Sequence, residues 1–132
     1  MFAAAVALAL PGCAIFTETH DIQEIDNWAI RNEALARSGK MKWSQFYGLY
    51  LERVSATPVI SQGPLVETLG ILITASLFYE QGRLSKGDFE SVQSIVRTYQ
   101  SIDDAAANVL ARDALITALE RGEKAQTGAV PP

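Results

Sequence analysis

Apolar residues recur at spacings of three and four along most of the chain after residue 20, and this spacing limits the fold more than any other feature. It places side chains on one face of an α-helix. No stretch of roughly four to eight β-branched or aromatic residues alternates cleanly with polar ones, as a half-buried strand would. The pattern therefore predicts an all-α protein. We expect a small bundle of about five helices, arranged as two αα-hairpins plus a C-terminal helix.

Two helices are expected in the first half of the bundle. The first starts near Asp21, carries an apolar stripe from Ile22 to Leu35 and stops at Gly39. The second spans about residues 43–55 and gathers aromatic side chains. Residues 56–64 contain two prolines and a glycine and are predicted to form a loop.

The third predicted helix, about residues 65–81, is apolar around most of its circumference. Such a helix is usually the central one, so Leu72 and Leu77 are both predicted to be buried. The fourth helix is predicted to start at Ser85, with Asp88 completing a capping box.

The fifth predicted helix starts at Ser101 with Asp104 and stops at Gly122. The helical domain would then cover residues 21–123, followed by a disordered tail at 124–132. The predicted apolar stripe of this helix contains Ala105, Val109, Ala114, Leu115 and Leu119.

A short motif occurs twice, at an offset of 43 residues. Gly39-Lys40-Met41 followed by Phe46 corresponds to Gly82-Arg83-Leu84 followed by Phe89. Each copy predicts a helix closed by a left-handed glycine and a new helix after the turn. Residues 80–89 also resemble the helical-hairpin turn of the short C-terminal domain called SHOCT, a resemblance that implies a turn and no function.

The N-terminal segment has the features of a secretory leader. Ala3 to Leu10 is an uncharged apolar run that would span about 12 Å as a helix, too short to cross a membrane but suited to a signal peptide. Leu10-Pro11-Gly12-Cys13 follows and resembles the bacterial lipobox. The proline and the absence of a basic residue before the run depart from the usual pattern.

The lipobox resemblance implies that the Cys13 thiol is acylated and that the chain is cut before it. Residues 1–12 would then be the signal peptide, and residues 13–20 the lipidated N-terminus and tether. The residue after the cysteine is Ala14 and not Asp, and in this the chain resembles lipoproteins that are sent to the outer membrane. The resemblance implies a protein that faces the periplasm. The alternative is a buried structural cysteine in a cytosolic protein.

Composition excludes several classes of protein. The 132 residues are 48% hydrophobic and 20% charged, which indicates one folded domain rather than a disordered chain. A net charge of −4 argues against a nucleic-acid partner, because phosphate binding needs a basic face. One cysteine and one histidine exclude a disulfide framework and a zinc site of the Cys₄ or Cys₂His₂ type.

Catalytic motifs are missing from the sequence. The one histidine, His20, precedes the first predicted helix, and no Gly-x-Ser-x-Gly or glycine-rich phosphate loop occurs. His20 and Glu24 could share a divalent ion, but a solvated helix start is the expected role of these residues. We therefore expect no catalytic residue, no metal and no cofactor.

An aromatic run beginning at Trp43 has two interpretations. In the first, its side chains build the core of the first hairpin; in the second, they line a half-exposed groove for a peptide or glycan strand. Basic residues beside it, Arg37 among them, would suit an acidic partner. The candidate partner-binding residues are Trp43, Tyr47, Lys40 and Lys42.

Together these features favour a lipid-anchored cell-envelope protein with a structural role or one of partner binding through a helix face. Its expected partners are the membrane, through the N-terminal lipid, and an envelope protein, but no nucleic acid. The alternative is an envelope enzyme or enzyme inhibitor with an unrecognised polar pocket.

Overall fold

The computed structural model describes residues 21–57, 63–100 and 102–127, with the side chains of 125–127 left out of the description. The predictions made for residues 1–20, Cys13 included, and for 128–132 lie outside these residues. Within them the chain forms five helices and no strand, so the predicted all-α class is confirmed.

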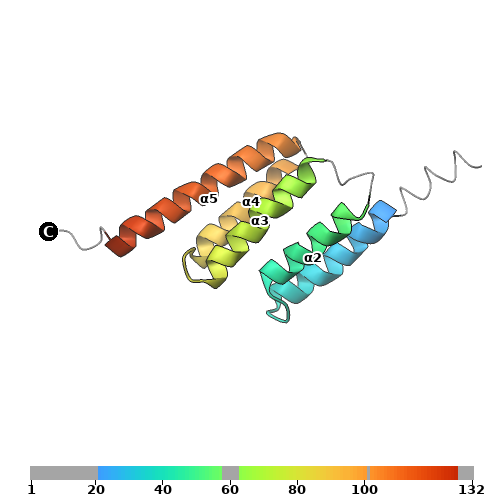
Figure 1. The fold of residues 1–132 in the computed structure, drawn as a ribbon, viewed down its shortest axis with the longest axis horizontal. Coiled ribbons are helices and arrows are strands. Elements are labelled where there is room, and N and C mark those ends of the chain that lie inside the picture. The colour runs from blue at the N-terminus through green and yellow to red at the C-terminus, as the bar shows by residue number, and fades with distance from the viewer. Residues whose placement is uncertain (1–20, 58–62, 101, 128–132) are drawn as a thin grey trace, which may run out of the picture.

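The helices pack as two antiparallel hairpins and a fifth helix (Figure 1). The N-terminal helix, at the blue end of the ribbon, lies beside α2, and α3 packs against α2, α4 and α5. The third helix is therefore central, as predicted. The N-terminal helix is helical over residues 21–37, and the others are α2 (Trp43–Ser55), α3 (Pro64–Glu80), α4 (Lys86–Gln100) and α5 (Asp104–Thr127).

Both hairpins turn through the same backbone motif. Gly39 has φ +81° and Gly82 has φ +77°, the left-handed conformation that glycine adopts without steric cost. The N–H of Lys40 donates to the Leu35 carbonyl at 2.9 Å, and the N–H of Arg83 donates to that of Phe78 at 2.8 Å.

Each glycine N–H also donates to a carbonyl three residues earlier, so both helices end in a Schellman motif. The repeat extends into the core, because Phe46 and Phe89 are each only 1% exposed. The predicted 43-residue sequence repeat therefore corresponds to a turn and a buried phenylalanine that occur twice in the structure.

Replacing Gly39 or Gly82 by valine is expected to lower the free energy of unfolding by more than about 1 kcal/mol, because a β-branched residue is strained at positive φ. Gly70 is the matched control. It lies within α3, and a Cβ added there would meet no atom within 4 Å. Gly70→Ala should be neutral or stabilising. Urea unfolding would measure all three, and an unchanged stability for both valine variants would contradict the turn assignment.

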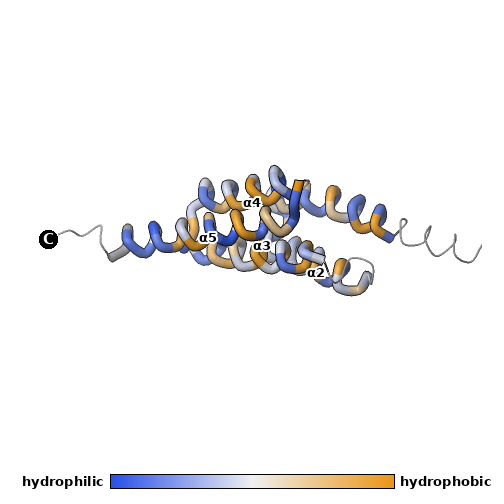
Figure 2. Tube along the Cα trace, turned by 90° about the horizontal axis from the view of Figure 1, so that it is seen from above, coloured by the Kyte–Doolittle hydropathy of each residue, from blue (hydrophilic) through white to orange (hydrophobic). Residues whose placement is uncertain are grey.

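The buried face of α5 differs from the predicted one. Ala105 and Val109 are exposed, Val109 by 53%. Figure 2 shows hydrophilic and hydrophobic residues alternating along α5. Only part of the predicted stripe is buried, because the residues of α5 that contact α3 and α4 are mainly alanines and an asparagine. The buried residues are Ala107, Asn108, Ala111, Leu115 and Ala118.

The ends of α5 also correct the sequence prediction. Ser101 lies outside the described residues, and the Asp103 carboxylate accepts a hydrogen bond from the N–H of Ala105 at 3.0 Å, as an N-cap does. Gly122 does not stop the helix, which continues to Thr127. The domain boundary at 123 and the tail from 124 were therefore placed too early. One glycine within a strong helical pattern costs only about 1 kcal/mol, and the pattern prevails here.

The capping of α4 agrees in part with the predicted capping box. The N–H of Asp88 donates to the Ser85 hydroxyl at 3.0 Å. No return bond from the Asp88 carboxylate to the Ser85 N–H is present, and this carboxylate lies 3.3 Å from the Arg121 guanidinium instead. Asp88 therefore links α4 to α5 across the surface.

Candidate functional site

Both hairpin turns lie at one end of the bundle and enclose an open cleft of about 400 Å³, here called the turn-end cleft. Two of the four candidate residues, Lys42 and Trp43, line it. Tyr47 is buried and Lys40 is exposed on the first turn, so neither lines the cleft. The structure thus brings half of the predicted set together.

The floor of the turn-end cleft is aromatic and joins the two hairpins. The Trp43 ring stacks on Tyr47, with centroids 5.6 Å apart, and meets the edge of Phe89 at 5.8 Å. Phe89 in turn stacks on Tyr79 at 4.8 Å, with an interplanar angle of 4°. Buried Tyr47 and Phe89 therefore fix the orientation of partly exposed Trp43.

Three basic and two acidic side chains line the turn-end cleft. The Arg37 guanidinium lies 5.6 Å from the Trp43 ring centroid and also pairs with Glu33 at 2.6 Å. Lys42 and Lys86 form no ion pair or side-chain hydrogen bond with any other described residue. These two ammonium groups remain available to a ligand.

The Glu80 side chain is hydrogen-bonded to the start of α2. Its carboxylate accepts hydrogen bonds from the Ser44 N–H at 3.0 Å and from the Ser44 hydroxyl at 2.6 Å. Ser44 lies in the first turn of α2, whose N-cap residue Lys42 makes no side-chain capping bond. Glu80, at the end of α3, therefore caps α2 from a neighbouring helix.

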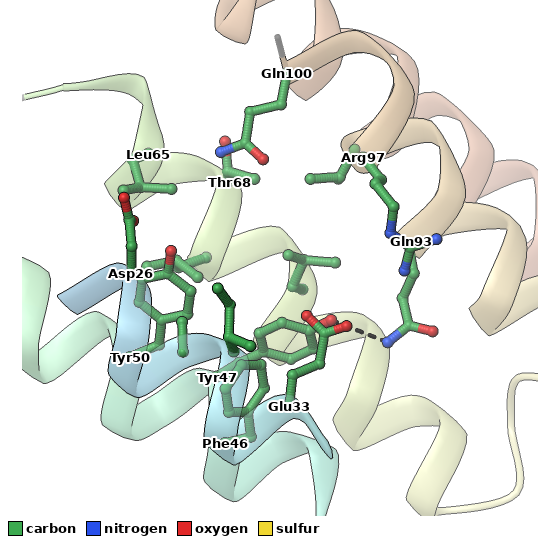
Figure 3. Close-up of a pocket in the computed structure, with 15 residues that line it drawn as sticks. Asp26, Glu33, Phe46, Tyr47, Tyr50, Leu65, Thr68, Gln93, Arg97 and Gln100 are labelled. Carbon is green, nitrogen blue, oxygen red and sulfur yellow. Dashed lines mark hydrogen bonds between the residues drawn. The ribbon is translucent and has the colours of Figure 1, made fainter. Parts of the chain in front are cut away.

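A second cleft, of about 350 Å³, lies between the two hairpins (Figure 3). Asp26 and Glu33 face it from the N-terminal helix, and Arg97 and Gln100 face it from α4. Its floor is apolar and includes Phe46. We call it the inter-hairpin cleft.

A buried hydrogen bond separates the two clefts. The Gln93 side-chain amide donates to the Tyr47 hydroxyl oxygen at 2.9 Å, from α4 to α2. Gln93 lines both clefts. Burial raises the pKa of Tyr47 to about 12, against 10.0 for a free tyrosine, and this outweighs the opposite effect of the Gln93 hydrogen bond.

The raised pKa of Tyr47 predicts a loss of stability at high pH. An unfolded tyrosine ionises near pH 10, whereas Tyr47 in the folded chain stays protonated to about pH 12. Between these two pH values ionisation stabilises only the unfolded state, so the free energy of unfolding falls as the pH rises. The wild type should lose about 1 kcal/mol by pH 11 relative to Tyr47→Phe. Urea titrations at pH 9 and pH 11 would measure this. An identical pH dependence in both proteins would contradict the burial of the phenol.

Neither cleft holds an obvious catalytic group. Within the described ranges, no group of three or more His, Cys, Asp or Glu side chains could bind a metal ion. Among the same residues no helix is long and apolar enough to cross a membrane. The polar side chains that line the two clefts can form hydrogen bonds and ion pairs with a ligand.

Sequence reasoning did not find Tyr79, Lys86 or Phe89 as parts of the site. They come from the second hairpin, far along the chain from Trp43. The 43-residue repeat was the signal that could have found them, since equivalent turns of packed hairpins lie at the same end of a bundle.

Comparisons with known proteins do not assign a family. No family model matches the sequence, and the searches of curated proteins and of solved structures give no significant match.

Proposed function

We propose that this protein is a lipid-anchored component of the bacterial cell envelope that binds a protein partner through the turn-end cleft. The observation that carries the anchor is Leu10-Pro11-Gly12-Cys13 directly after an apolar run. Cys13 is also the single cysteine of the chain, as suits a thiol reserved for lipid.

The anchor would hold the bundle close to the membrane. Each buried methylene of an acyl chain contributes about 0.8 kcal/mol, so two or three chains give stable attachment, whereas a single chain does not. Cys13 and Asp21 are eight residue steps apart, and each step spans at most about 3.6 Å, which limits the reach of the tether to roughly 30 Å. With Ala14 after the cysteine, we place the protein at the outer membrane, facing the periplasm.

The turn-end cleft supports the proposed binding role. Its central side chain, Trp43, is partly exposed and rests on buried aromatic rings, which is a common form of anchor point in protein interfaces. Because the surrounding turns are closed by Schellman motifs, the site is held in place before a partner arrives.

The anchor is tested by Cys13→Ser in a bacterium that matures lipoproteins. This variant is expected to remain an uncleaved precursor and to lose all label from radioactive palmitate. Ala14→Ser is the matched control, because it changes the neighbouring residue but keeps the thiol, and it should be labelled like the wild type. A wild-type protein without label would overturn the anchor.

A further inference from the structure

We infer that the turn-end cleft recognises an acidic peptide segment, with a carboxylate held by Lys42 and Lys86 and a neighbouring apolar side chain against Trp43. This inference rests on the proposed binding function and names the chemistry of the partner. It is carried by the placement of the two lysines, by the charge of the cleft and by its aromatic floor.

Both lysines occupy positions that disfavour a positive charge. Lys42 is the N-cap residue of α2, a helix with no acidic residue in its first turn, and Lys86 is the first residue of α4. A cation at the positive end of a helix dipole is destabilising, and Ser, Thr, Asp or Asn are the residues that stabilise an N-cap. Capping and the helix dipole therefore do not explain either lysine, whereas binding of an anion would.

The charges around the cleft favour an anionic ligand. Glu80 keeps its negative charge but has both carboxylate oxygens hydrogen-bonded to Ser44, so it pairs directly with neither lysine, and Glu90 is the other acid of the lining. Arg37 is paired with Glu33, so the positive charges of the lining without a partner among the described residues are those of Lys42 and Lys86. Two such ammonium groups in one cleft favour an acidic partner over a basic one.

The aromatic floor favours a ligand that has an apolar group beside its negative charge. Trp43 and Tyr79 are partly exposed beside the lysines, and both rest on buried Phe89. An aromatic or aliphatic side chain next to the carboxylate would cover these rings and remove apolar surface from water. A peptide that carries both groups fits the cleft better than phosphate or acetate.

The test uses the full-length chain and three synthetic peptides of equal length. One has the sequence Glu-Phe-Glu with blocked ends, one has Gln-Phe-Gln, and one has Lys-Phe-Lys. NMR spectra follow the indole N–H signals of both tryptophans during titration. Trp28, which is buried away from the cleft, is the internal control for Trp43. We expect the acidic peptide to shift the Trp43 signal and to bind at least about tenfold more tightly than the amide peptide.

Charge variants of the protein make the test specific to the cleft. Lys42→Asp and Lys86→Asp should each weaken binding of the acidic peptide by about tenfold or more, and Lys42→Asp should melt at the same or a higher temperature. Lys124→Asp is the matched control, since it makes the same charge change on an exposed residue of α5 outside the cleft. Its affinity should stay within about twofold of the wild type.

The outcomes separate this inference from the proposed function. If the amide or basic peptide shifts Trp43 as strongly as the acidic one, the cleft binds peptides but the acidic preference is wrong. Equal weakening by all three lysine variants also overturns the inference, because the effect is then one of overall charge. If no peptide shifts Trp43, both the acidic preference and the binding role of the cleft are overturned.

Discussion

Leu72→Ala is expected to lower the free energy of unfolding by about 2–5 kcal/mol. Leu72 is 5% exposed on α3, the helix that contacts α2, α4 and α5. Truncation to alanine removes buried methyl groups and leaves a cavity that rigid neighbouring helices fill only in part. Urea unfolding of the purified protein would measure the loss.

Leu77→Ala on the same helix is the matched control. Leu77 is 44% exposed, which contradicts its predicted burial, and its truncation should cost far less than that of Leu72. Equal losses for the two variants would mean that α3 is packed in another orientation.

Asn108→Ala is expected to lower the free energy of unfolding by about 2–3 kcal/mol, an unusual loss for a polar residue. Asn108 is 1% exposed on α5. Its amide nitrogen donates to the Pro64 carbonyl at 3.1 Å and to the Glu67 carboxylate at 3.3 Å, and its oxygen accepts a hydrogen bond from the Thr68 hydroxyl. Alanine would remove the Asn108 acceptor from the buried Thr68 hydroxyl and would open a cavity in the contact between α3 and α5.

The neighbouring Val109→Ala provides the control for this network. Val109 is 53% exposed on α5, and alanine has the higher helix propensity, so the stability of Val109→Ala should stay within about 0.5 kcal/mol of the wild type. A loss for Val109→Ala that equals the loss for Asn108→Ala would contradict the orientation of α5.

Features set by local chemistry could be predicted from the sequence. The limits of α2 and the left-handed conformations of Gly39 and Gly82 agree with the predictions, because capping and turn geometry depend on a few adjacent residues. Leu77 and Val109 were placed wrongly. Most of the circumference of α3 is apolar, and the buried face of α5 consists mainly of alanines and an asparagine, so hydrophobicity did not mark the inward side.

The candidate site could be predicted only on its first hairpin. Lys42 and Trp43 were found because an aromatic residue beside a basic one is visible in a short window. Glu80 and Lys86 act across the bundle, where Glu80 caps α2 and Lys86 faces the same cleft as Lys42. Such contacts depend on how the two hairpins pack against each other, and this packing is difficult to predict from a single sequence.

The central claim is that the bundle is attached to a bacterial membrane through Cys13. Mass spectrometry of the N-terminal peptide, taken from the protein extracted from membranes with detergent, tests it most directly. The account predicts a peptide that begins at Cys13 and carries a diacylglycerol thioether, with an additional acyl group on the amino terminus. A peptide that begins at Met1 and has an unmodified Cys13 thiol would contradict it.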